Sequence, residues 1–248
     1  MTTDEPTTPA RNPFEPPERR KTKPLPGDFG EGVLGRASRA IYWYIVLTLL
    51  LALASVPTLV IALLLAPSPS NVPFIALAFI PLGPALSAAL YTVRARYTDE
   101  DLAPSKAFWK GYRLNWADVL RLWVPALVVI GIIGFVLAFA DTAGIGTLYR
   151  IVLGIIGALV AAWALQGVAI ATFFSFRTRD VARLAVYYLL MVRVVLGVIA
   201  LVLIAATVTW FLSELVLALI GGIWVWFWYQ NDKPMLLDVF HRFTKQED

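Results

Sequence analysis

Cysteine is missing from this chain, and histidine occurs once, as His241. The first absence excludes disulfides, iron–sulfur clusters and thiol nucleophiles. The second excludes histidine-rich metal sites and most histidine-based acid–base catalysis. There is also no phosphate-binding loop and no dinucleotide fingerprint. We therefore expect no catalytic, metal or cofactor site and no nucleic-acid partner.

Charge is scarce and apolar residues are abundant. Charged residues make up 15% of the 248 positions and hydrophobic residues 59%, against about 25% and 45–50% in soluble domains. Because one soluble core cannot hide so much apolar surface, the surrounding solvent must be lipid. A span needs about 20 apolar residues to cross about 30 Å of hydrocarbon. The apolar runs predict an all-α, polytopic membrane protein with six transmembrane helices as three hairpins, over 41–66, 72–91, 119–140, 145–176, 194–212 and 215–229.

The fifth span has two candidate starts. An apolar run before Arg193 allows an earlier start that would hold this arginine inside the bilayer. We favour the later start, which places Arg193 at the interface, where its guanidinium reaches water.

Segments outside the spans define the domain organisation. Residues 1–27 are rich in proline and charge, and predict a disordered cytoplasmic tail. Residues 28–243 form the predicted membrane domain, and 244–248 a short C-terminal tail. Amphipathic cytoplasmic segments are expected near 29–39, 104–118 and 178–193.

Lysine and arginine set the orientation. With both termini in the cytoplasm, every one of the 21 basic residues except Arg150 lies on the cytoplasmic side. Insertion bias and anionic lipid favour that side for basic residues. The prediction is therefore N-in and C-in, in a bacterial plasma membrane. Aromatic residues at the span ends fit interface anchors, with a ligand-stacking role as the alternative.

The second span contains helix-breaking residues near its middle: Pro81, Gly83 and Pro84. Such a break is either a packing kink or part of a watery cavity that marks a substrate site. Gln166 is the main strongly polar side chain within the spans. Because no Asp, Glu, Lys or His lies deep in a predicted span, a proton-driven transporter is disfavoured.

Residues 104–118 alternate aromatic and basic side chains at helical spacing. They predict an amphipathic helix that either lies on the membrane surface or docks a partner. The candidate partner-binding residues are Phe108, Trp109, Lys110, Tyr112, Arg113 and Trp116. Rows of small residues around Gly154 and Ala158 allow close helix packing within one molecule or in a homo-oligomer.

Several segments resemble the YesL family of bacterial integral membrane proteins of poorly defined function. They are ALYTVRARY (89–97), the D-L-x-P turn, FWKGYRLNWADVLRLWVPAL (108–127) and YQNDKPMLLDVFHRF (229–243). The resemblance implies an accessory role beside carbohydrate ABC importers. Residues 105–125 also loosely echo the cytoplasmic coupling motif of ABC permeases, without its leading glutamate and with the spacing one residue off.

These observations lead to three hypotheses. The first is a non-enzymatic accessory or scaffold protein of the inner membrane that contacts lipids and ABC transporter subunits. The second is a small-solute channel or facilitator, with Pro81–Pro84 and Gln166 lining a central cavity. The third is a regulator that senses membrane stress through its amphipathic helices.

Overall fold

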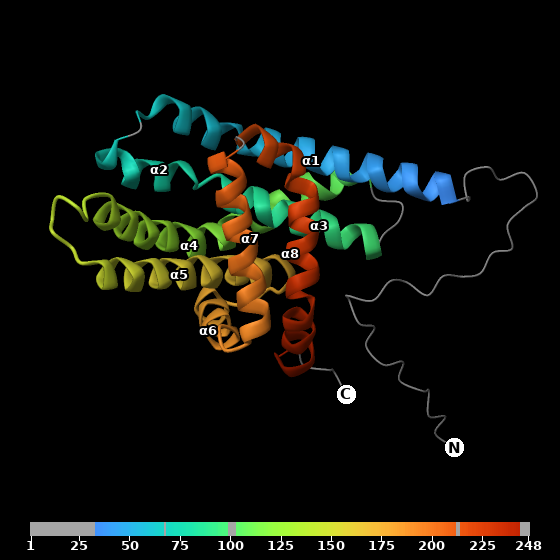
Figure 1. Cartoon of the computed structure of the whole chain (residues 1–248). Helices are drawn as coiled ribbons and strands as arrows, with labels where there is room; N and C mark the ends of the chain where they lie inside the picture. Colours follow the sequence, from blue (N-terminus) through green and yellow to red (C-terminus); the bar gives the residue numbers. More distant parts are fainter. Residues whose placement is uncertain (1–32, 67, 99–102, 212–213, 244–248) are drawn as a thin grey trace, which may run out of the picture.

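The computed structural model describes residues 33–66, 68–98, 103–211 and 214–243, and within these ranges the chain forms helices and no strand. Figure 1 shows their arrangement. The helices are α1 (Val33–Leu64), α2 (Val72–Ala78), α3 (Leu82–Thr98), α4 (Pro104–Ala138), α5 (Thr147–Phe173), α6 (Thr178–Tyr188), α7 (Val192–Phe211) and α8 (Glu214–Phe243), with a 3₁₀ turn, η1 (Pro69–Asn71), before α2.

Four helices, α1, α4, α5 and α7, are long and apolar enough to cross a membrane. A fifth span is obtained if α2 and α3, which meet at a bend of 40°, are counted together. The all-helical fold and the multi-pass membrane class are therefore confirmed. The described part of α8 does not meet the same measure, so the sixth span stays a prediction.

One predicted boundary changes in the structure, and another is confirmed. The predicted surface helix 104–118 and the third span are one continuous helix, α4, which contains Pro125 in its interior. The chain breaks after α6 and restarts at Val192, which confirms the later start of the fifth span. Predictions for residues 1–27, for 29–32 and for 244–248 lie outside the described residues.

Helix α3 lies at the centre and packs against α1, α4, α5 and α8. Its buried side chains are mostly small, including Ala85, Ala88 and Ala89, and its Ser87 hydroxyl lies 2.8 Å from the Thr172 hydroxyl of α5. Small residues let helix backbones approach closely where apolar area alone gives no drive to associate. By contrast, α1 exposes a row of large apolar side chains such as Leu49.

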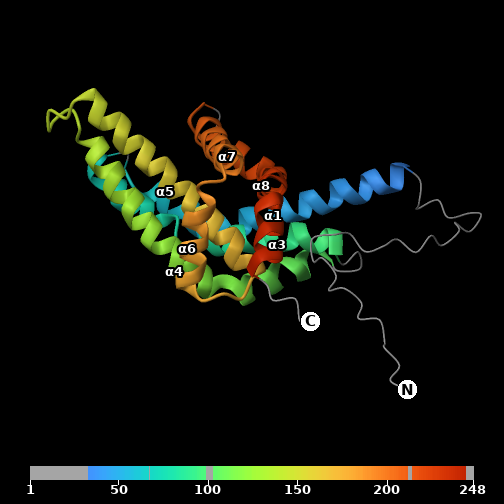
Figure 2. The ribbon, with the colours of Figure 1, turned by 90° about the horizontal axis from the view of Figure 1, so that it is seen from below.

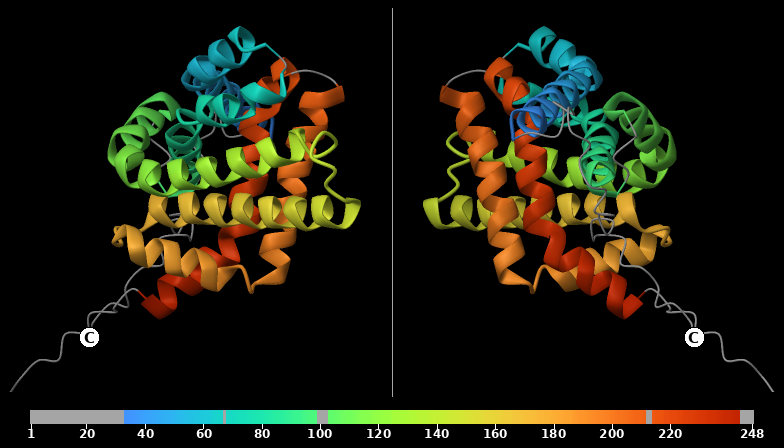
Figure 3. Two further views of the ribbon diagram at one scale, coloured as in Figure 1. Left: turned by 90° about the vertical axis from the view of Figure 1, so that its left-hand side faces the viewer. Right: turned by 90° about the vertical axis from the view of Figure 1, so that its right-hand side faces the viewer.

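The α7–α8 hairpin runs across the α4–α5 hairpin instead of alongside it (Figures 1 and 3). Figure 2 shows the same arrangement from below. Helix α8 is held to α1 by the backbone N–H of Gly222, which donates to the Thr48 hydroxyl at 3.1 Å, and to α7 by the indole N–H of Trp224, which donates to the Leu201 carbonyl at 3.0 Å. Because the two hairpins cross, they cannot both lie along the membrane normal, and at least one of them is tilted.

Candidate functional site

The first half of α4 has one face in the core and one exposed face. Pro104 occupies the first helical position, where its missing N–H is harmless. Ala107, Phe108 and Gly111 are buried. A Cβ at Gly111 would lie 2.7 Å from the Cβ of Tyr91, so this glycine permits the close packing of α4 on α3.

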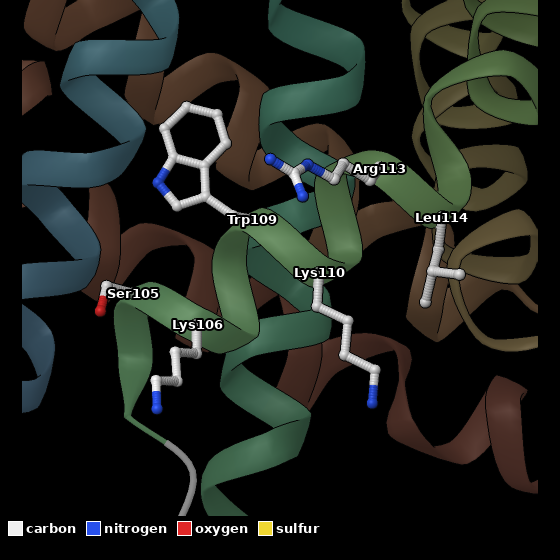
Figure 4. Close-up of a pocket in the computed structure, with 6 residues that line it drawn as sticks. All are labelled: Ser105, Lys106, Trp109, Lys110, Arg113 and Leu114. Atoms are coloured by element: carbon white, nitrogen blue, oxygen red, sulfur yellow. The ribbon is translucent and has the colours of Figure 1, made fainter.

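The opposite face of α4 forms a shallow hollow of about 520 Å³, which we call the basic face. Figure 4 shows Trp109 and Arg113 projecting to one side of α4, and Lys106, Lys110 and Leu114 to the other. The residues that line it are Ser105, Lys106, Trp109, Lys110, Arg113 and Leu114.

None of the described residues that line the basic face is acidic. Between described residues, the ion pairs are those of Arg121 with Asp118, Arg150 with Asp141, and Arg242 with Asp238. The three cations of the hollow are therefore not neutralised by a described carboxylate. The arrangement attracts an anionic group and offers an indole ring beside it.

The six predicted partner-binding residues fall into three groups. Trp109, Lys110 and Arg113 line the basic face. Trp116 is exposed but lies outside the hollow, and Tyr112 is half-buried with its ring centroid 5.7 Å from that of Trp109. Phe108 is fully buried in the core and presents no surface to a partner. Its neighbours in sequence, Ala107 and Gly111, are the signal that this side of the helix faces inward.

The predicted break in the second span is present, between α2 and α3, and it is packed in protein. The carbonyl of Phe79 accepts hydrogen bonds from the Trp123 indole N–H at 2.9 Å and from the Leu82 N–H at 3.1 Å. Gly83 and Pro84 are buried in α3, and Pro81 is half-buried. These contacts favour the packing kink over a watery cavity.

Gln166 is fully buried in α5, and neither its amide nitrogen nor its oxygen has a hydrogen-bond partner among the described residues. It lies seven residues before Phe173, on the same side of α5. Because the Phe173 ring lies 6.0 Å from that of Tyr229 of α8, this side of α5 faces α8. No hydrogen bond between described residues joins Gln166 to the break at Pro81–Pro84.

A cluster of arginines and aromatic rings closes the end of α3. Arg96 lies over the Tyr44 ring at 4.7 Å, and the Tyr97 hydroxyl accepts a hydrogen bond from the Trp226 indole at 2.8 Å. The Tyr97 ring stacks on Tyr229 at 6.1 Å. These contacts join α1, α3 and α8, which gives the ALYTVRARY segment a structural role.

The sequence analysis missed a buried carboxylic acid, Asp232. Helix α8 continues beyond the predicted end of span six, and Asp232 is fully buried there. The sequence analysis considered ionisable side chains only within the predicted spans, and Asp232 lies three residues beyond the last of them. The signal was Trp228, one helical turn earlier, whose indole N–H donates to Asp232 at 2.8 Å.

Helix α6 packs beside the end of α8. Its Tyr188 hydroxyl donates a hydrogen bond to Asp238 at 2.8 Å, and Arg242 pairs with the same carboxylate at 2.8 Å. Burial raises the pKa of Tyr188 above its usual range, and the hydrogen bond to Asp238 acts in the same direction. A second hollow of about 440 Å³ lies between α6 and Phe243, with Arg183 and Asp180 both on its wall.

Residues 41–137 match the family model described as "Protein of unknown function, DUF624". Over these residues the chain is similar to a DUF624 domain. This is the domain of YesL-like proteins, so the resemblance to that family is confirmed. The DUF624 match runs from α1 into the end of α4, and therefore includes both the break before α3 and the basic face. No curated protein and no solved structure matches the chain.

Proposed function

We propose that this protein is a non-enzymatic accessory or scaffold of the bacterial plasma membrane, and that it docks a cytoplasmic partner through the basic face of α4. The observation that carries the proposal is the continuity of α4. One helix joins an apolar span to a cationic and aromatic surface that no described carboxylate neutralises. A partner bound there is fixed rigidly to the membrane domain.

The length of α4 supports a surface that stands clear of lipid. Its 35 residues extend about 50 Å at about 1.5 Å per residue, whereas the hydrocarbon core is about 30 Å thick. Roughly 20 Å of the helix therefore projects beyond the core. Headgroups occupy only part of that length, so Lys106 and Lys110 are available to a protein carrying acidic side chains.

The proposed topology has six spans with both termini in the cytoplasm. The predicted sixth span, 215–229, occupies the first half of α8, and the helix continues beyond it. On the opposite side, the lone basic residue Arg150 pairs with Asp141 at 2.6 Å, which reduces its cost at that end. An association with a carbohydrate ABC import system is the partner that the family resemblance suggests. The channel hypothesis loses support because Trp123 closes the break before α3.

The docking proposal is tested by exchanging residues of the basic face. The double variant Trp109→Ala, Arg113→Ala should lower retention of a membrane-system partner in mild detergent by about tenfold or more, as loss of interface anchors does. The control is Tyr149→Ala, Arg150→Ala, which removes an exposed aromatic residue and an arginine at the opposite end of the bundle. Equal retention by the two double variants would contradict docking at this face.

Topology is tested separately with single cysteines, because the natural chain has none. Leu114→Cys and Phe243→Cys should resist a membrane-impermeant maleimide in intact spheroplasts, whereas Leu148→Cys should react. All three side chains are exposed, so accessibility reports the side of the membrane. Labelling of residue 243 from outside would rule out the six-span topology.

A further inference from the structure

The buried carboxyl group of Asp232 accepts two hydrogen bonds from its own helix. Its Oδ2 accepts from the Trp228 indole N–H at 2.8 Å, and its Oδ1 accepts from the Asn231 amide nitrogen at 3.0 Å. Asp232 lies three residues beyond the predicted end of the sixth span. This site is therefore separate from the basic face of α4, and its link to cytoplasmic pH rests on the topology of the proposed function.

Asn231 connects this carboxyl group to α7. The same amide nitrogen that donates to Asp232 also donates to the Val194 carbonyl, at 2.9 Å, in the first turn of α7. One turn further along α7, Gly197 leaves the space that the Asn231 amide occupies, because a Cβ on Gly197 would overlap it. The packing of the first turn of α7 therefore depends on the orientation of the Asn231 amide group.

Among the described residues, no positive charge compensates Asp232. The helices packed against α8 are α1, α3, α5 and α7. Their described cations lie elsewhere: Arg39 is exposed, Arg94 lies over Phe173, Arg96 lies over Tyr44, Arg150 pairs with Asp141, and Arg193 is exposed. On α8 itself Lys233 is half-buried and Asp238 pairs with Arg242.

Within the described part of the chain, the pKa of Asp232 is set by burial and by its two hydrogen bonds. Burial raises its pKa to about 7, while the hydrogen bonds from Asn231 and Trp228 act in the opposite direction. No neighbouring tyrosine, arginine or lysine contributes. A carboxyl group in such surroundings exchanges its proton within the ordinary cytoplasmic pH range.

We propose that Asp232 is a proton-binding site that couples cytoplasmic pH to the first turn of α7 through Asn231. As a carboxylate, Asp232 offers acceptor lone pairs to both N–H donors, and this fixes the Asn231 amide so that its second hydrogen reaches Val194. When a proton from water binds one carboxyl oxygen, that oxygen becomes a donor and the group becomes neutral. One N–H group then loses its charge-assisted bond, and the Asn231 amide is released to rotate.

The two consequences of protonation have opposite signs. The pKa of Asp232 is raised in the folded protein, so proton binding adds to the free energy of unfolding. This contribution is fully present below the pKa of the unfolded chain and is lost as pH rises through the pKa of the folded protein. The hydrogen bond that holds α7 follows the reverse course, and is tightest where Asp232 is charged. Acid therefore stabilises the bundle as a whole while it loosens the contact of α8 with the first turn of α7.

Infrared spectroscopy of the full chain in lipid nanodiscs tests proton binding. A carboxylic acid band from a buried group should be present at about pH 5.5 and absent at about pH 8.5, as expected for a titration near neutrality. Asp232→Asn should remove this band. The matched control, Asp238→Asn, exchanges a partly exposed carboxylate on the same helix and should leave the band unchanged. A titrating band that survives Asp232→Asn, or no such band in the natural protein, overturns the proposal.

A second variant keeps the proposal testable if Asp232→Asn does not fold. Asn231→Ala removes a hydrogen bond that favours the charged form, so the band should titrate at a higher pH. A nitroxide on Leu190→Cys, an exposed position between α6 and α7, should become more mobile in acid. That response should disappear with Asn231→Ala. An unshifted midpoint, or a nitroxide whose mobility ignores pH in the natural protein, overturns the coupling.

Discussion

Gly83 is expected to tolerate no side chain, and Gly83→Ala measures how tightly the break before α3 is packed. A Cβ at this position would lie 2.5 Å from Cδ1 and 2.6 Å from Cγ of Trp123. The indole cannot swing aside freely, because its N–H is bonded to the Phe79 carbonyl. Overpacking of this kind costs about 1–3 kcal/mol. The higher helix propensity of alanine offsets about 0.5–1 kcal/mol of that cost.

Gly154→Ala supplies the matched control. Gly154 is also inside a helix, but nothing lies within 4 Å of its Cβ position. Only the propensity gain applies there, so this variant should be more stable by about 0.5–1 kcal/mol. The two alanine variants should therefore differ by about 1–3 kcal/mol, which is the overpacking cost alone. Denaturant unfolding of the purified protein in mild detergent gives the comparison.

A double-mutant cycle identifies the clash. Trp123→Leu in the Gly83→Ala background should recover part of the loss, since the added methyl group then has room. The packing interpretation is refuted if Gly83→Ala is as stable as Gly154→Ala, or if the two substitutions at 83 and 123 are additive.

Other contacts give sharper local tests by the same unfolding assay. Gly222→Ala should destabilise by about 1–3 kcal/mol, because its Cβ would lie 3.0 Å from the backbone carbonyl of Tyr44, which cannot rotate away; a neutral result would contradict close contact of α8 with α1. Tyr188→Phe should cost about 0.5–1.5 kcal/mol by removing the hydrogen bond to Asp238, and proteolysis of α6 should become faster; unchanged proteolysis would argue against this anchor. Asp118→Asn breaks an exposed pair and should change stability by less than about 1 kcal/mol; a larger loss would mean that the pair is buried by a partner.

The apolar runs were sufficient to predict the long helices, because lipid imposes a minimum length and forbids unpaired backbone groups. The break at Pro81 was also predictable, since proline removes a donor wherever it stands. Its closure by Trp123 was not, because that contact spans 44 residues. Sequence spacing places residues on one helix face but does not identify the neighbouring helix.

The basic face shows the same limit within a single helix. Phe108 and Trp109 are adjacent in sequence but lie in different surroundings. Phe108 is buried in the core, whereas Trp109 lines the hollow. Aromatic content alone did not separate them, whereas the small residues beside Phe108 would have. Asp232 was missed for a different reason. It follows the apolar run instead of interrupting it, and burial there depends on α8 continuing as a helix past Tyr229.

The small side chains of α3 restrict how this sequence can change over time. Ala85, Ala88 and Ala89 are each fully enclosed by neighbouring helices, so at these positions almost every replacement enlarges the side chain. Exchange among glycine, alanine and serine remains open, but drift toward leucine or valine is blocked. The lipid-facing side of α1 has the opposite freedom, because bulk can be added there without displacing a neighbour. Random mutagenesis should therefore find that the exposed side of α1 tolerates most substitutions, whereas the buried positions of α3 tolerate few.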